Sequence, residues 1–93
     1  MNVRLTQPAE FDLERLADRI AQIDPQRAKM IAEQLKAAAR TIGHAPFQYP
    51  RVAADPRLRK KSVRPFVLLF EVRGDHVLIL RIAHERSDWA SLV

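Results

Sequence analysis

The chain has no cysteine and only two glycines among its 93 residues. The missing cysteines exclude a disulfide framework, a zinc ribbon and a thiol nucleophile, so packing alone must stabilise the fold, as in proteins of a reducing cytoplasm. The two glycines, Gly43 and Gly74, stand far apart, which excludes the glycine-rich loops that bind nucleotide phosphates. We therefore expect a cytoplasmic protein that carries no cofactor.

Long apolar runs are also missing. The longest, Phe66 to Phe70, is far shorter than the roughly 20 residues of a membrane helix. The N-terminus lacks the apolar stretch of a secretory signal, so we expect the mature protein to start at Met1 and to have no membrane span.

The three histidines, His44, His76 and His84, do not have the spacing of metal ligands. None of them is three or four positions from another, as ligands on one helix face would be. His76 and His84 lie about 26 Å apart along a strand that rises about 3.3 Å per residue. The sequence therefore predicts no metal site.

The remaining composition is that of a soluble globular protein, with 47% apolar and 29% charged residues. The length suits one domain, residues 1–93, since most domains hold about 100 to 150 residues. Sixteen lysines and arginines against eleven acidic residues give a net charge of +5. This excess favours an acidic partner such as nucleic acid, a membrane surface or an acidic polypeptide, without choosing among them.

The first part of the chain has the pattern of a short strand followed by a helix. Val3 and Leu5 alternate with polar residues up to Thr6, which predicts a strand. Pro8 favours a helix start, and a helix over about residues 8–22 places a set of apolar side chains on one face: Leu13, Leu16, Ala17 and Ile20.

A second helix is predicted from Pro25 to Ile42. Asp24 is a typical N-cap residue, and proline suits the first helical position. Apolar residues then recur every three or four positions, and Gly43 is predicted to be the C-cap. Because the turn between the two helices is short, they must pack as an antiparallel hairpin.

The second part of the chain has the pattern of a loop and three strands. Residues 43–56 contain three prolines, and we expect Phe47 and Tyr49 to pin this loop to the core. Segments rich in β-branched and aromatic residues predict strands at about 58–63, 66–73 and 76–83. The predicted fold is α+β in the order β-α-α-β-β-β, with an antiparallel meander sheet packed against a helical hairpin.

The last two strands pose a problem of register. The expected core residues are all even-numbered: Phe66, Leu68, Phe70 and Val72 in one strand, and Leu78, Leu80 and Ile82 in the next. A two-residue Gly74-Asp75 turn would place Val72 opposite Val77 and break this match. We therefore expect a three-residue turn or a β-bulge there.

Positive charge is concentrated before the second of these strands. Five basic residues fall within eight positions and no acidic residue lies among them: Arg57, Arg59, Lys60, Lys61 and Arg64. One interpretation is a solvated edge strand that lysine and arginine protect against aggregation. The other is a binding site for phosphate or for an acidic peptide.

The C-terminal segment also carries candidate functional residues. His84 and Arg86 lie where the last strand ends, and Arg81 precedes them. Histidine with arginines could cut RNA, because imidazole moves a proton while guanidinium stabilises the phosphate transition state. The alternative is structural: His84 and Asp88 form a hydrogen bond that fixes the tail, and Trp89 covers an apolar gap. We favour the structural alternative, since only one obvious acid–base group is present.

The order of elements, the basic segment and the ending Ile79 to Asp88 together resemble the RelE/ParE superfamily of bacterial type II toxins. The resemblance covers nearly the whole chain and includes an opening of Leu5-Thr6, Ala9-Glu10 and Asp12-Leu13. The His-x-Arg-x-Asp pattern of His84, Arg86 and Asp88 is similar to the ParE branch.

Within this superfamily, RelE-like members cut messenger RNA in the ribosomal A site and ParE-like members poison DNA gyrase. RelE-like members have an arginine where this chain has Val67, and often a tyrosine or second histidine where it has Trp89. The resemblance thus implies a ParE-like, growth-inhibiting gyrase poison of the plasmid-stabilising type, with no catalytic residue. The alternative is a RelE-like endoribonuclease, whose catalytic residues would be Arg64, Arg81, His84 and Arg86.

The resemblance also implies a ParD-like antitoxin whose acidic C-terminal segment masks the toxin. The residues expected to bind the antitoxin or the target are Arg57, Arg59, Lys60, Lys61, Arg64, Arg86 and Trp89. A helical hairpin beside a basic sheet edge offers an apolar groove ringed by positive charge, which suits an acidic amphipathic peptide.

A third possibility, an independent basic DNA-binding module, has less support. No segment has the pattern of a helix-turn-helix recognition helix. The second helix carries a set of cations that is ordinary for a solvated surface: Arg27, Lys29, Lys36 and Arg40. We therefore expect no direct DNA contact without the antitoxin and no membrane partner.

Overall fold

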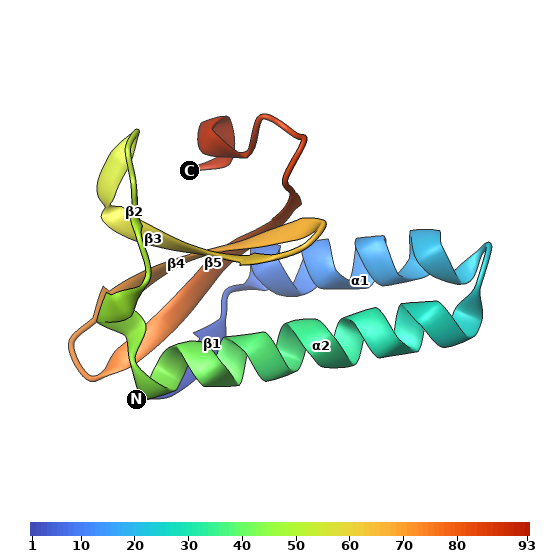
Figure 1. Ribbon diagram of the computed structural model, residues 1–93, viewed down its shortest axis with the longest axis horizontal. Coiled ribbons are helices and arrows are strands. Elements are labelled where there is room, and N and C mark those ends of the chain that lie inside the picture. The colour runs from blue at the N-terminus through green and yellow to red at the C-terminus, as the bar shows by residue number, and fades with distance from the viewer.

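Two antiparallel helices cover one face of a five-stranded sheet in the computed structural model, which describes residues 1–93 (Figure 1). The helices are α1 (Gln7–Ala21) and α2 (Pro25–His44). The strands are β1 (Asn2–Leu5), β2 (Arg51–Val52), β3 (Asp55–Val63), β4 (Phe66–Arg73) and β5 (His76–His84). Their order in the sheet is β1-β5-β4-β3-β2, with β1 parallel to β5 and the other pairs antiparallel. The predicted α+β class and helical hairpin are confirmed, and the short strand β2 is an addition.

Both helices start at side-chain caps. The Thr6 hydroxyl accepts a hydrogen bond from the Ala9 N–H at 3.3 Å, and the Asp24 carboxylate accepts one from the Arg27 N–H at 3.1 Å. Each bond satisfies a backbone donor that the first helical turn leaves without a partner. The predicted boundaries of both helices agree with the observed ones to within two residues. Neither helix combines the length and the apolar character that crossing a bilayer needs.

Gly43 was expected to end the second helix, and this expectation is wrong. Helix α2 continues to His44, and Gly43 is buried within its last turn. A Cβ atom at Gly43 would lie 2.5 Å from the Met1 carbonyl oxygen and 2.8 Å from Val3 Cγ2. The glycine is therefore required because β1 passes against α2 at this point, and not because of a left-handed backbone.

The main hydrophobic core lies between the helices and the sheet. Leu35 and Ile42 of α2 pack there against the helix-facing residues of the central strands, which include Leu68, Phe70 and Ile79. These side chains are fully buried, so each contributes about 1.5–3 kcal/mol relative to an exposed position. The apolar stripe predicted for the second helix faces the sheet as expected.

A second apolar cluster lies on the opposite face of the sheet. It consists of Val52, Leu58, Val67, Leu69 and Ala83, with Leu80 and Trp89 packed against it. The chain after β5 folds back over this face, away from the helices (Figure 1). The prediction that Trp89 covers an apolar gap is confirmed.

The pairing of β4 with β5 corrects the predicted register. The turn has two residues, so Arg73 pairs with His76 and Val72 lies opposite Val77. The bulge is not at the turn but at Leu80, because Phe70 pairs with Ile79 and Leu69 pairs with Arg81. Before the bulge the helix-facing residues of β5 are therefore Val77 and Ile79 rather than Leu78 and Leu80, and only Ile82 faces the helices as predicted.

The loop between α2 and β3 is pinned by one aromatic residue rather than two. The Tyr49 ring packs edge-on against Phe70 with ring centroids 5.9 Å apart. Phe47 belongs to a short 3₁₀ turn (Pro46–Gln48) and is 61% exposed. The expectation that both rings reach the core is thus correct only for Tyr49.

Candidate partner-binding groove

The basic residues of β3 do not form one continuous patch, since their side chains go to both faces of the sheet. The Lys61 ammonium lies 4.7 Å from the Tyr49 ring centre on the helix side, whereas the Lys60 ammonium lies 5.0 Å from the Trp89 ring centre on the other side. The Arg59 guanidinium donates to the Tyr49 carbonyl at 2.7 Å and also packs over the Phe47 ring. These three cations therefore fasten the loop and the tail to β3.

Arg57 is also engaged within the chain. Its guanidinium donates to both carboxylate oxygens of Asp55, at 3.0 and 2.8 Å, and its backbone N–H donates to the same carboxylate. Hydrogen bonding to Arg57 lowers the pKa of Asp55, and hydrogen bonding to Asp55 raises the pKa of Arg57. Of the predicted basic run, only Arg64 has a side chain without such a contact.

Arg81, a candidate catalytic residue, is held in place by a carboxylate from α1. Its Nε and Nη2 atoms donate to the two oxygens of Asp12 at 2.8 and 3.0 Å. Hydrogen bonding to Asp12 raises the pKa of Arg81. The structure therefore gives Arg81 a structural contact rather than an open position.

His84 is exposed, and one of its ring nitrogens is already occupied. Its Nδ1 accepts a hydrogen bond from the Arg86 N–H at 3.1 Å, so in the neutral ring the proton resides on Nε2. In that state Nε2 carries the hydrogen and is the donor of the ring. The expectation of a hydrogen bond between His84 and Asp88 is wrong. The N–H and the hydroxyl of Ser87 both donate to the His84 carbonyl, and these bonds fix the start of the tail.

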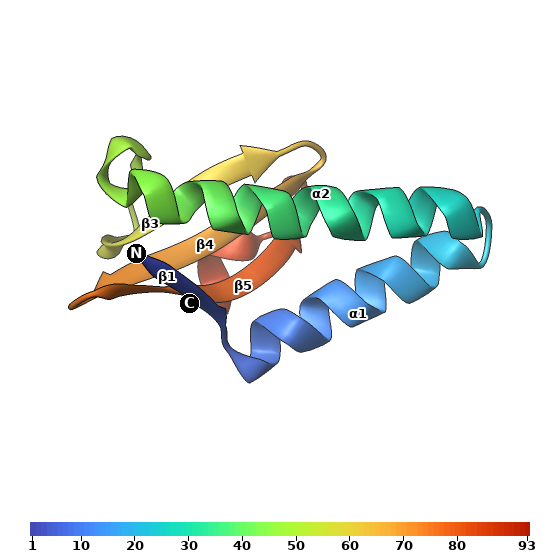
Figure 2. The same cartoon turned by 90° about the horizontal axis from the view of Figure 1, so that it is seen from below.

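An apolar groove of about 550 Å³ lies beside His84, between the helical hairpin and the end of the sheet. Its apolar lining comes from both layers and consists of Leu16, Ile20, Ile23, Ile31, Pro65, Phe66, Ile82 and Ala83. The turn end of the hairpin projects beyond the sheet, so this part of the helices has no strand beneath it (Figure 2). Ile23, at the turn, is 90% exposed, which is unusual for a large apolar side chain.

Positive charge surrounds the apolar lining of this groove. Arg15 and Arg19 line it from α1 and Arg27 lines it from α2, and two aspartates, Asp12 and Asp24, also lie in the lining. Arg64 lines an adjoining hollow together with Arg27 and Pro65. The groove thus combines an apolar lining with an excess of positive charge, since one of its two aspartates, Asp12, is already paired with Arg81.

Sequence reasoning missed Arg15 and Arg19 and treated Arg27 as an ordinary surface residue. The one available signal was Ile23, an apolar residue at the turn outside both helical stripes. Among the predicted binding residues, Arg64 lies next to the groove and Arg86 adjoins His84, whereas Lys60 and Trp89 lie on the opposite face of the sheet.

The structure also describes the positions where a metal or a RelE-like arginine would lie. No three histidine, aspartate or glutamate side chains are grouped as metal ligands would be. Val67, where the superfamily resemblance implied an arginine in RelE-like members, is 3% exposed and belongs to the cluster beneath Trp89. The fold and the groove thus define a small basic α+β protein with an apolar groove between its helical layer and its sheet.

Comparison with known proteins agrees with this class. Residues 3–89 match the family described as ParE toxin of type II toxin-antitoxin system, parDE, so the chain belongs to the ParE toxin family. A solved structure titled "Chromosomal ParDE TA system from P. aeruginosa" is similar to the chain, with a TM-score of 0.82 and 24% sequence identity. The similarity covers 90% of this chain and 95% of that one, and at this identity it shows the fold. No curated protein matches the chain.

Proposed function

We propose that this ParE-family toxin inhibits DNA gyrase in the cytoplasm and is neutralised by the acidic segment of an antitoxin, which binds in the groove. The observation that supports this proposal is the groove itself, whose apolar lining is accompanied by three arginines, Arg15, Arg19 and Arg27. Such a surface fits an amphipathic helix whose acidic residues flank an apolar stripe.

The arginines of the groove suggest how the antitoxin segment is recognised. Arg15 and Arg19 are four positions apart on α1, so they lie one helical turn apart on the same face. Acidic residues spaced by one turn on a bound helix would face both of them, while Arg27 lies on the second helix of the hairpin. Attraction of this kind mainly raises the association rate, which therefore falls as salt increases.

The proposal of gyrase inhibition rests on the state of the candidate catalytic residues. Arg81 is bound by Asp12, and Nδ1 of His84 accepts a hydrogen bond from the Arg86 N–H. A ribonuclease needs a base and an acid at the reacting phosphate, whereas a protein that blocks its target by binding needs neither. These contacts favour the gyrase poison over the RelE-like endoribonuclease.

Two assays run in parallel test the proposal. The purified chain is incubated with gyrase and plasmid DNA, and separately with translating ribosomes. We expect loss of supercoiling activity and no cleavage of messenger RNA. Codon-dependent cleavage of messenger RNA by the parent chain, with supercoiling unaffected, would refute gyrase as the target.

Charge reversal tests the groove as the antitoxin site. Arg15→Glu with Arg19→Glu should weaken binding of the antitoxin, because like charges then oppose its acidic segment. Lys29→Glu with Lys36→Glu is the matched control, since it reverses two exposed charges of α2 that do not line the groove. Equal binding by the two double variants would contradict the groove as the site.

A further inference from the structure

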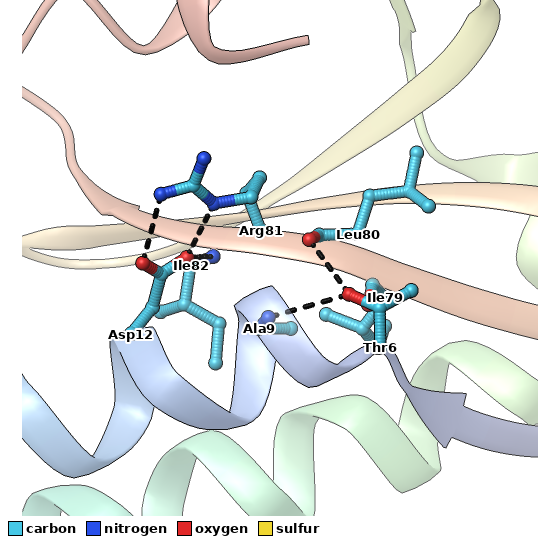
Figure 3. A network of polar contacts seen from close by, with 7 residues as sticks. All are labelled: Thr6, Ala9, Asp12, Ile79, Leu80, Arg81 and Ile82. Carbon is cyan, nitrogen blue, oxygen red and sulfur yellow. Dashed lines mark hydrogen bonds and ion pairs between the residues drawn. The ribbon is translucent and has the colours of Figure 1, made fainter.

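One carboxylate joins the helical layer to the sheet at the inner end of the groove. The Asp12 side chain accepts three hydrogen bonds, from Nε and Nη2 of Arg81 and from the Ile82 N–H at 3.0 Å (Figure 3). The Asp12 side chain is only 11% exposed. A carboxylate in this position, with both oxygens bonded to the opposite layer, has a fixed orientation.

No other ion pair of the chain joins two layers. The pairs Arg57–Asp55, Arg73–Glu71 and His76–Asp75 connect residues one or two positions apart in sequence. Asp12 and Arg81 are 69 positions apart. The Asp12–Arg81 pair is therefore the ionic link between the helical hairpin and the sheet.

The edge of β5 explains why a side chain is needed at this point. Strand β1 pairs with β5 only as far as Leu5 opposite Ile79. The Thr6 hydroxyl then donates to the Leu80 carbonyl at 2.9 Å, and Asp12 accepts from the Ile82 N–H (Figure 3). Beyond Leu5, β1 no longer pairs with β5. The side chains of Thr6 and Asp12 therefore make the hydrogen bonds to β5 that a neighbouring strand would otherwise make.

The same contact closes the inner end of the groove. Asp12, Leu16 and Ile20 are spaced by four positions on α1, so they follow one helical face outward along one wall of the groove. Ile82, whose N–H donates to Asp12, and His84, two positions further along β5, lie on the opposite wall. Beyond Asp12, no side chain hydrogen bond connects α1 to β5.

We infer that Asp12 and Arg81 are positioning residues that set the separation of the two groove walls and so hold the groove ready for its partner. The inference rests on the proposed function only for what occupies the groove. Without the link, α1 pivots on its apolar contacts, and the groove has the required width in a fraction of the molecules. If that fraction falls to about one tenth, the apparent affinity of the partner falls about 10-fold.

Because the chain has no cysteine, two introduced cysteines can carry spin labels that report the wall separation directly. Gln22→Cys at the hairpin turn and Glu85→Cys after β5 are exposed positions outside the groove lining. Double electron–electron resonance then gives the distribution of label distances. We expect a narrow distribution in the parent, a broader one in Asp12→Asn, which keeps one acceptor, and the broadest in Asp12→Ala.

Asp55→Ala is the matched control. Asp55 also accepts three hydrogen bonds, two of them from a guanidinium, but its partner Arg57 lies on the same strand. A purely stabilising role for Asp12 would lower the melting temperature and leave the distance distribution of the folded protein unchanged. That outcome, or equal broadening in Asp55→Ala, would overturn the inference.

Binding of the antitoxin separates this inference from the proposed function. A variant with a broadened distribution should bind the antitoxin more weakly at temperatures far below unfolding. Unchanged affinity in such a variant would leave the role of Asp12 supported and would contradict the groove as the antitoxin site.

Discussion

Replacing Gly43 by alanine tests how closely β1 approaches α2. In an exposed helix interior, glycine to alanine stabilises by about 1 kcal/mol, because alanine loses less backbone freedom on folding. At Gly43 the new Cβ would lie 2.5 Å from a backbone oxygen of Met1, whereas favourable contacts lie at about 3.5–4 Å. Backbone cannot rotate out of the way as a flexible side chain can, so β1 must move by about 1 Å.

The magnitude follows from three terms. Overpacking of this kind costs about 1–3 kcal/mol. Displacing β1 also weakens the bond from the Met1 ammonium to the Gly43 carbonyl, 2.9 Å long, which adds about 1 kcal/mol. Subtracting the helix-propensity gain of about 1 kcal/mol leaves an expected loss of about 1–3 kcal/mol in unfolding free energy.

Urea unfolding followed by circular dichroism measures this loss. Ala37→Gly is a suitable control, because Ala37 is exposed in the same helix and reports propensity alone. The control should lose about 1 kcal/mol. If Gly43→Ala instead gains stability, β1 does not pack against α2 as described, and the explanation of Gly43 is wrong.

Three further predictions concern the core and the binding surface. Leu35→Ala, at a position only 1% exposed, should cost about 2–5 kcal/mol in urea unfolding, and a near-zero change would place Leu35 outside the core. His84→Gln should leave growth inhibition intact at an unchanged melting temperature; a harmless but fully folded variant would instead favour the endoribonuclease. Arg64→Glu should weaken the proposed gyrase inhibition without loss of stability. Lys60→Glu and Lys61→Glu should each lower the free energy of unfolding by about 0.5–1 kcal/mol, because their contacts with aromatic rings are lost. Inhibition assays and thermal unfolding of the three charge variants separate these outcomes.

The helical hairpin could be predicted from the sequence because its signals are local. Asp24-Pro25 and the spacing of apolar residues lie within a few turns of the helices they define. The role of Gly43 could not be predicted, since the atoms that exclude a Cβ belong to Met1 and Val3, some 40 positions away. The local sequence pattern predicted a helix C-cap at Gly43, whereas the actual role of this glycine depends on its contact with Met1 and Val3.

The sequence predicted the general character of the groove but not the residues that line it. An apolar surface with positive charge was expected beside the hairpin, but the charges were assigned to the basic run of β3. Lys60 and Lys61 alternate between the faces of the sheet and contact aromatic rings, which the density of charge in the sequence does not reveal. In the sequence, Arg15 and Arg19 resemble ordinary helix-surface cations. Only the folded structure shows that they line the same groove as residues of β4 and β5.

The bulge at Leu80 determines where β5 can lose a residue without moving its other side chains to the wrong face. Val77 and Ile79 face the helices before it and Ile82 faces them after it, so the two ends of the strand are out of phase by one residue. Deleting Leu80 would restore strict alternation and keep every other side chain on its present face. Deleting a residue before Leu80 or after Arg81 would instead move part of the strand to the wrong face of the sheet. Among relatives that vary in length along this strand, the variation should therefore fall at the bulge, where the chain has one residue more than the ladder needs.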